Sequence, residues 1–316
     1  MKKGRILKQT TGYLAPPDLE KNLRQELKNV IHEYDRLFIA NGAPQTAYWA
    51  QNIWLDPQII QFDSISDAAK KLREIQKLWS FYPYKNIRRG TLITEKLPYF
   101  PSKPLTFPSI IPNTPLGSWA LLDANTILAS PHCSSLFPQG EVHFQESKIP
   151  PSRAYLKLWE ALTRAGTFPK EGDVCLEVGA SPGSWTWVLE QLGATVIAVD
   201  RALLDPSIAA LPRVTFLKKD AFSLTPKDFP KLDWIFSDLI CYPEKLLDWV
   251  KQWIDINAKV NFVCTLKFQG EVSDIIIKEF QKIEGSHIVH LFHNKHELTW
   301  FKLATTPQPF ISAKSS

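Results

Sequence analysis

A run of small residues, GASPGSW, directly follows the apolar segment VCLEV and leads into a predicted helix. In a strand–loop–helix unit, small residues let a ligand approach the backbone closely, and the N-terminus of the helix faces the same ligand. The run has neither the GxGxxG spacing of NAD-binding loops nor the Lys-Ser/Thr of a phosphate-binding loop. We therefore expect it to hold another nucleotide-containing cofactor. The candidate cofactor-binding residues here are Glu177, Gly179, Ala180, Ser181, Pro182, Gly183, Ser184 and Trp185.

Acidic residues stand at or after the ends of three consecutive apolar runs. Asp200 closes the second run, 23 residues after Glu177, where a carboxylate can accept hydrogen bonds from a ribose diol. Asp220 follows the third run and is placed to meet the edge of an adenine. A lone acid after a strand is more often a turn residue or a helix cap. Three acids after three consecutive strands favour a cofactor site.

A parallel sheet is needed to bring these residues together. Continuous apolar runs such as VCLEV, TVIAV and VNFVCTL are typical of buried parallel strands, and helical stretches separate most of them. Only residues 294–296 and their immediate neighbours divide the last two runs, too few for a crossover helix, so that pair should be antiparallel. We expect a Rossmann-like α/β domain over 146–316. Its predicted strands are 174–178, 195–199, 214–217, 233–237, 260–266, 287–292 and 298–303.

Five segments of this half resemble, in order, the motifs of the FtsJ-like ribose 2′-O-methyltransferases. They are SRAYLKL (152–158), EVGASPGSW (177–185), SDL (237–239), LKFQGE (266–271) and HELTWF (296–301). Pro243 after Asp238, and the segment PSRAYLKLWEAL, look closest to the RlmM-type branch, which methylates a cytidine of bacterial large-subunit (23S) ribosomal RNA. That branch carries a longer N-terminal region with a THUMP module. The resemblance covers about half the chain and implies S-adenosyl-L-methionine as cofactor and an RNA ribose as substrate.

The resemblance also implies a catalytic tetrad, matched here by Lys157, Asp238, Lys267 and Glu297. A ribose hydroxyl is a poor nucleophile and must lose its proton as it attacks a methyl group in line. Lys267 could take that proton if a neighbouring cation and partial burial favour its neutral form. Lys157 would supply the cation, while Asp238 and Glu297 would orient both ammonium groups and Asp238 would also border the cofactor. No metal is required.

Other reactions fit the sequence less well. Enzymes that methylate amino groups of nucleic acids typically show an Asn/Asp-Pro-Pro-aromatic stretch after the fourth strand, and SDLICYP differs from it. Cys241 lacks the adjacent Pro-Cys pattern of carbon methylation. A transfer RNA or a capped messenger remains an alternative substrate. A non-catalytic RNA-binding or assembly factor with this fold remains an alternative of another class.

The N-terminal half is predicted to be a small α/β domain of ferredoxin-like type over 1–95. Helical spacing over 18–34 and 67–78 is separated by β-rich runs at 37–40 and 47–55. Six prolines between Pro98 and Pro115 exclude a helix there, so 96–145 is expected to be a connector. The runs 119–122 and 126–129 could form a hairpin within that connector.

Charge and aromatic residues point to RNA as the partner of this half. Residues 1–145 contain 17 Lys and Arg against 12 Asp and Glu, whereas 146–316 contain 20 against 20, so the whole net charge of +5 lies in the first part. The segment 79–89 interleaves aromatic residues with the candidate RNA-binding cations Lys85, Arg88 and Arg89. Aromatics stack on unpaired bases and cations meet phosphates, but these aromatics could equally be core residues.

Composition narrows the cellular setting. The basic N-terminus is followed by no apolar h-region, and nowhere do eighteen apolar residues run together, so we expect a cytoplasmic protein with no membrane partner. The four cysteines stand far apart without a CxxC pair, which favours neither a zinc site nor a disulfide framework.

Overall fold

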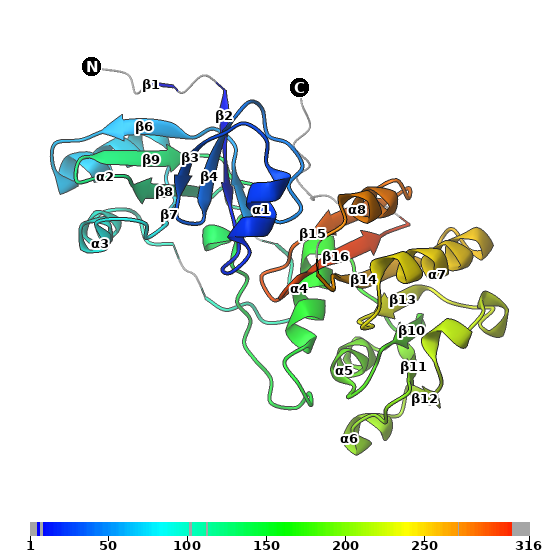
Figure 1. Cartoon of the computed structure of the whole chain (residues 1–316). Coiled ribbons are helices and arrows are strands. Elements are labelled where there is room, and N and C mark those ends of the chain that lie inside the picture. Colours follow the sequence, from blue (N-terminus) through cyan, green and yellow to red (C-terminus); the bar gives the residue numbers. More distant parts are fainter. Residues whose placement is uncertain (1–4, 7–8, 101–102, 112, 271, 305–316) are drawn as a thin grey trace. The chain divides into compact units, whose positions relative to one another are not determined.

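The computed structural model describes residues 5–6, 9–100, 103–111, 113–270 and 272–304. These fall into two compact units (Figure 1). The first comprises the described residues up to Leu105 together with Ile111–His143, and the second comprises Thr106–Ile110 and the described residues from Phe144 onward. The segment expected as a connector, 96–145, thus belongs mostly to the first unit. None of the described helices is long and apolar enough to cross a membrane.

The second unit is built on one seven-stranded sheet in the order β12-β11-β10-β13-β14-β16-β15. The five strands from β12 to β14 are parallel, and β16 is antiparallel to both of its neighbours. The predicted Rossmann-like sheet with an antiparallel last strand is therefore confirmed. Its strands are β10 (Val174–Val178), β11 (Thr195–Asp200), β12 (Val214–Lys218), β13 (Trp234–Ser237), β14 (Asn261–Lys267), β15 (Ser286–Val289) and β16 (Glu297–Lys302).

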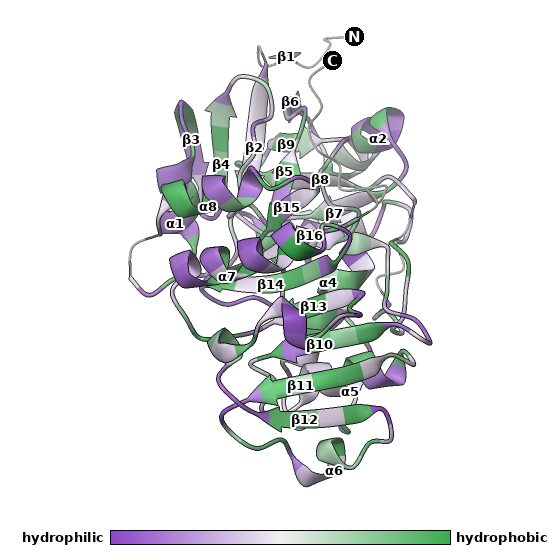
Figure 2. Ribbon diagram, turned by 90° about the vertical axis from the view of Figure 1, so that its right-hand side faces the viewer, coloured by the Kyte–Doolittle hydropathy of each residue, from purple (hydrophilic) through white to green (hydrophobic). Residues whose placement is uncertain are grey.

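Helices cover both faces of this sheet, which explains why its strands read as continuous apolar runs (Figure 2). On one face lie α4 (Tyr155–Ala165), α5 (Ser184–Gln191) and the short α6 (Pro206–Ala209). On the other lie α7 (Pro243–Ile256) and α8 (Asp274–Gln281). Two 3₁₀ turns, η2 (Ala221–Ser223) and η3 (Pro226–Asp228), follow β12. The helix ends follow local rules, because Pro243 occupies the first turn of α7 and Gly166 closes α4 with a positive φ of 62°.

The first unit contains two sheets. One has the antiparallel order β3-β4-β2-β5, which is the strand order of a ferredoxin-like unit. A single helix, α1, accompanies it, because the chain between β4 and β5 forms no helix. The elements are β2 (Thr10–Leu14), α1 (Glu20–Glu26), β3 (Val30–Tyr34), β4 (Leu37–Asn41) and β5 (Asn52–Trp54).

The prediction of one helix over 18–34 is wrong in its second half. The helix ends at Glu26, and Asn29 has a positive φ of 56° that interrupts any helical continuation. The β-branched pair Val30 and Ile31 then begins a strand.

The other sheet of the first unit has the order β1-β6-β9-β8-β7. The predicted hairpin is β8-β9, but β9 also pairs with β6 and β8 with β7, so it is the middle of a sheet. Both strands of the hairpin are fully buried, and an isolated hairpin could not bury them. The elements are β1 (Arg5–Ile6), β6 (Gln58–Gln61), α2 (Ile65–Ile75), β7 (Trp79–Phe81), α3 (Ile87–Thr94), β8 (Gly117–Leu121), β9 (Thr126–Ser130) and the 3₁₀ turn η1 (Pro138–Gly140).

Candidate active site

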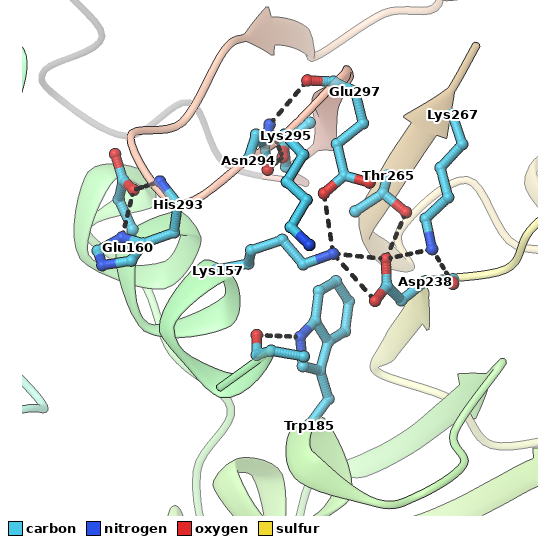
Figure 3. A network of polar contacts seen from close by, with 12 residues as sticks. Lys157, Glu160, Trp185, Asp238, Thr265, Lys267, His293, Asn294, Lys295 and Glu297 are labelled. Carbon is cyan, nitrogen blue, oxygen red and sulfur yellow. Dashed lines mark hydrogen bonds and ion pairs between the residues drawn. The ribbon is translucent and has the colours of Figure 1, made fainter. Parts of the chain in front are cut away.

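Four elements of the second unit bring the expected tetrad residues together at one edge of the sheet (Figure 3). Lys157 lies in the first turn of α4, and Asp238 directly follows β13. Lys267 ends β14 and Glu297 begins β16, and the two are directly opposite each other in the antiparallel pairing. The carboxyl ends of the parallel strands therefore meet the start of the antiparallel one, which is where an open α/β sheet places its ligands.

The four side chains form one ion-paired cluster. Lys157 Nζ donates to Asp238 Oδ1 at 2.9 Å and Oδ2 at 3.0 Å, and to Glu297 Oε1 at 2.9 Å. Lys267 Nζ lies 2.9 Å from Asp238 Oδ1 and donates to the backbone oxygen of Asp238 at 2.6 Å. Each side chain is less than one-fifth exposed. The three protons of Lys157 are thus all engaged by carboxylates, whereas one proton of Lys267 has no partner among the described residues.

Charge pairing outweighs burial in this cluster. Burial opposes the charged form of Lys157, but Asp238 and Glu297 outweigh it and raise the pKa of Lys157 above its usual value. Burial would likewise raise the pKa of Asp238, but Lys157 and Lys267 outweigh it and hold that pKa below its usual value. Lys157 and Asp238 therefore stay ionised across the neutral range.

Two further side chains support the cluster, and one of them, Thr265, is not among the site residues predicted from the sequence. Thr265 Oγ1 donates to Asp238 Oδ1 at 2.8 Å. Thr265 lies two residues before Lys267 on β14, so both face the same side of the sheet, and this period of two was the available signal. The centre of the Trp185 ring lies 5.9 Å from Lys157 Nζ, and Trp185 Nε1 donates to the backbone oxygen of Ala154 at 2.9 Å.

The start of α4 is tied to the start of α5. Ser184 Oγ lies 2.8 Å from Ser152 Oγ, accepts from the backbone N–H of Ser152 at 3.0 Å and donates to its backbone oxygen at 3.0 Å. Ser184 and Trp185 are both almost completely buried. These two candidate cofactor-binding residues therefore hold the segment that carries Lys157, and their side chains point into the protein.

A buried glutamate connects α4 to the loop before Glu297. Glu160, one turn after Lys157, is fully buried and accepts from Arg164 Nε at 2.8 Å and from the backbone N–H of Phe292 at 2.9 Å. It also accepts from the backbone N–H of His293 at 3.0 Å and lies 2.8 Å from His293 Nδ1. Burial disfavours the carboxylate, but Arg164 and His293 outweigh it and lower the pKa of Glu160 to about 2. No local sequence pattern indicates this connection, because its partners lie 132 and 133 residues away.

The small-residue loop between β10 and α5 has the close-packed form that a cofactor site needs. Gly179 and Gly183 have positive φ values of 77° and 113°. A Cβ added at Gly179 would lie 2.9 Å from the backbone nitrogen of Leu239, and one at Gly183 would lie 2.7 Å from Ile208. The loop therefore adjoins the segment that follows Asp238, and its backbone surface would be obstructed by larger residues. Ser181 is half-buried and Pro182 is exposed on this loop, whereas Ala180 is buried.

Two of the three expected acids lie at the rim of this loop. Asp200 accepts backbone N–H groups from Ser181 at 3.0 Å and Ala202 at 2.8 Å. A carboxylate has about four acceptor positions, so Asp200 retains two for a ribose diol. Asp220 is exposed and its carboxylate caps η2 through the backbone N–H of Phe222 at 3.0 Å. These positions suit a nucleoside group.

Glu177 does not reach that rim. It is 2% exposed, and its Oε2 accepts from Thr186 Oγ1 at 2.6 Å inside the unit. Burial raises the pKa of Glu177 to about 8. This residue thus joins β10 to α5 and is almost closed to solvent.

The candidate RNA-binding cations lie in the first unit, at the start of α3. Lys85 and Arg88 are exposed and Arg89 is half-buried, with its guanidinium 5.4 Å from the centre of the Phe62 ring. Two of the neighbouring aromatics, Trp79 and Tyr82, are almost completely buried, and Phe81 and Tyr84 are half-buried against the core. The two buried rings cannot stack on bases, and the core interpretation of the aromatics is the one that the structure favours.

Comparison with known proteins decides the family. A family model described as FtsJ-like methyltransferase matches residues 150–316, more than half of this chain. The chain belongs to the FtsJ-like methyltransferase family. The resemblance seen in the sequence motifs is thereby confirmed, and S-adenosylmethionine is the cofactor of this methyltransferase. Within the described residues, no group of three or more His, Cys, Asp or Glu side chains is arranged to hold a metal ion.

Individual relatives of this FtsJ-like methyltransferase carry a common name. The ribosomal RNA large subunit methyltransferase M of Halorhodospira halophila is 28% identical over 186 residues, covering 55% of this chain and 53% of that protein. The protein of the same name from Marinobacter nauticus is 30% identical over 184 residues, covering 53% and 51%. The chain thus spans about half the length of these curated relatives. Among solved structures, Aeropyrum pernix fibrillarin with bound S-adenosyl-L-methionine is 16% identical with a TM-score of 0.35, covering 58% of this chain and 81% of that one.

Proposed function

We propose that this protein transfers a methyl group from S-adenosylmethionine to the 2′ hydroxyl of a ribose in RNA. The observation that carries the proposal is the paired cluster of Lys157, Asp238, Lys267 and Glu297 beside the glycine loop (Figure 3). A largely buried, ion-paired set of two lysines and two acids suits a reaction that must move one proton. The family supplies the reaction class.

The cofactor-binding surface would be the loop Gly179–Gly183 with Asp200 and Asp220 at its rim. Asp200 would accept the ribose hydroxyls of the cofactor, and Asp220 would meet the adenine edge. When bound, S-adenosylmethionine supplies an electrophilic methyl group on a sulfonium. The remaining task of the chain is to orient an RNA hydroxyl toward that methyl and to hold its proton.

Lys267 is the residue that would accept this proton. As a neutral amine it has two N–H donors, which can keep both of its contacts with Asp238, and one lone pair, which can accept the hydroxyl proton. Lys157 cannot share this role, since its three protons all contact carboxylate oxygens. Lys157 and Glu297 would instead hold Asp238 in place, and through it Lys267.

We further propose large-subunit (23S) ribosomal RNA as the substrate, in the cytoplasm, with the first unit as the RNA-positioning part. The relatives named as ribosomal RNA large subunit methyltransferases support the substrate. The net charge of +5 on residues 1–145 and the exposed Lys85 and Arg88 support the role of the first unit.

The test uses purified protein, methyl-labelled S-adenosylmethionine and ribosomal RNA from a strain that lacks the gene. Nuclease digestion and mass spectrometry then identify the methylated nucleoside and its position. We expect one 2′-O-methylated nucleoside in large-subunit RNA. Label on a base would contradict the reaction, and label only in transfer RNA or capped messenger would contradict the substrate. Cofactor binding without transfer to any RNA would favour a non-catalytic factor.

A further inference from the structure

A lysine outside the tetrad lies beside the cluster. Lys295 lies in the loop between β15 and β16, two residues before Glu297, and is exposed. Figure 3 shows its side chain directed from the loop toward Lys157. In the part of the chain that the structure describes, its ammonium group takes part in no hydrogen bond or ion pair.

The backbone around Lys295 is fixed on both sides. The backbone oxygen of Lys295 lies 3.0 Å from His290 Nε2, and burial lowers the pKa of His290 to about 4, so the neutral ring donates through Nε2. Asn294 is buried and donates through Nδ2 to the backbone oxygen of Glu297 at 3.2 Å and to Thr299 Oγ1 at 3.0 Å. The loop therefore presents Lys295 from a defined position.

The balance of charges in the cluster indicates a role for the ammonium group of Lys295. Lys157 and Lys267 are balanced by Asp238 and Glu297, so the cluster itself offers no excess positive charge to a polyanion. Lys295 adds that charge beside the cluster, on an exposed side chain that is directed toward Lys157. In RNA, the 2′ hydroxyl lies on the ribose carbon next to the one that bears the 3′ phosphate. A cation that holds this phosphate also fixes where the hydroxyl lies.

We infer that Lys295 binds the phosphate on the 3′ side of the ribose that is methylated. The inference rests on the proposed function and adds a requirement to it. The target must be an internal nucleotide whose 3′ phosphate is charged, and a nucleotide at a free 3′ end should be a poor substrate.

The test compares two RNA fragments that carry the nucleotide mapped above. One is natural, and the other has a single uncharged methylphosphonate on the 3′ side of the target. The variants are Lys295→Gln, Lys295→Arg and, as a control, Lys251→Gln on the exposed side of α7. We measure KM and kcat for each RNA and cofactor affinity by calorimetry.

On natural RNA, Lys295→Gln should raise KM about tenfold, the low end for a contact with a charged group. Lys295→Arg should restore most of the loss, and Lys251→Gln should change nothing. On the methylphosphonate RNA the wild type and Lys295→Gln should be equal, because the contact is already lost. Cofactor affinity should be the same throughout.

Two results would overturn the inference and leave the proposed function intact. One is an unchanged KM for Lys295→Gln on natural RNA. The other is an equal loss on both RNAs, which would mean that Lys295 acts elsewhere than at this phosphate. A wild-type protein that methylates neither RNA would overturn the proposed function and the inference with it.

Discussion

The two lysines of the cluster share one carboxylate but differ in their bonding. Lys157 donates to three carboxylate oxygens, two on Asp238 and one on Glu297. Lys267 contacts one carboxylate oxygen and one backbone oxygen of Asp238. A lysine whose protons are all engaged by anions is a fixed cation, whereas Lys267 has capacity for a substrate hydroxyl. Substitution of Lys267 should therefore affect the chemical step and leave cofactor binding intact.

Changing Lys267 to alanine should lower single-turnover methyl transfer by about 10² to 10⁴, the range for loss of a general base. Arginine should not rescue it, because a guanidinium stays protonated at any workable pH. Transfer from labelled S-adenosylmethionine to unmodified ribosomal RNA measures the rate, and calorimetry measures cofactor affinity. Near-normal transfer would remove Lys267 from the mechanism. Lost cofactor binding would make it structural.

Changing Glu177 to glutamine tests whether this buried acid is structural. Its pKa is raised from 4.5 to about 8, so the folded protein keeps a proton that the unfolded chain releases. The contribution of Glu177 to the free energy of unfolding should therefore be greatest below pH 4.5 and fall as pH rises toward about 8, by at most about 1.4 kcal/mol per pH unit. Glutamine can still accept from Thr186 and should remove this slope in urea unfolding at pH 5, 6.5 and 8. Identical slopes in both proteins would contradict the assignment. Reduced cofactor affinity in the variant would return Glu177 to the cofactor site.

At the scale of elements, α4 is attached at two places to the parts that complete the site. Its start is bound to α5 through Ser152 and Ser184, and its middle is bound through Glu160 to the loop that leads to Glu297. Lys157 lies between the two attachments. The position of its ammonium group therefore depends on both the cofactor loop and the β15–β16 loop.

Glu160→Ala should both destabilise the protein and slow methyl transfer. It leaves Arg164, His293 and two backbone N–H groups without their shared acceptor, and breaking a buried charged network costs about 3 to 5 kcal/mol. Because the pKa of Glu160 is lowered from 4.5 to about 2, its stabilisation is present above pH 4.5 and is lost as pH falls through about 2. Urea unfolding at pH 7 and pH 3 measures this difference.

The control for Glu160 is Glu279→Ala on α8, where a surface glutamate with a 35% exposed side chain pairs with the exposed Lys282. Its unfolding midpoint should match that of the wild type, because exposed pairs contribute little. A Glu160 variant that is as stable as this control would show that the connection to the loop is not needed.

The sequence predicted some elements better than others for physical reasons. The apolar runs marked the bounds of β10 to β14 within one residue, and β10, β13 and β14 are buried almost throughout. The helix predicted over 18–34 failed because helical spacing alone did not register Asn29 as a break. The tetrad was predicted residue by residue from motifs, and the period of two along β14 was the only signal for Thr265. Glu160 acts through contacts between distant segments, which no local pattern displays.

At the scale of the whole molecule, the net positive charge lies in residues 1–145, most of which form the first unit. Replacing Lys85, Arg88 and Arg89 together by alanine should lower RNA affinity, and the slope of log affinity against log salt should fall by up to about 2 to 3 as phosphate contacts are lost. Filter binding across a salt series measures both quantities, and circular dichroism checks folding, since Arg89 also packs on Phe62. The matched control replaces the exposed Lys251, Lys259 and Lys278 of the second unit. Equal effects of the two triple variants would place the RNA surface elsewhere.

The position of β16 has a consequence for how the protein is made. β16 follows β14 and β15 in the chain but lies between them in the sheet, and β15 pairs only with β16 in the described sheet order. During translation, the cofactor loop, Lys157, Asp238 and Lys267 all leave the ribosome before Glu297. Strand β15 cannot pair until β16 has emerged, and Lys157 cannot contact its second carboxylate, Glu297, before then. A nascent chain therefore completes its cofactor loop before its catalytic centre, and one strand insertion both closes the sheet and neutralises the cluster.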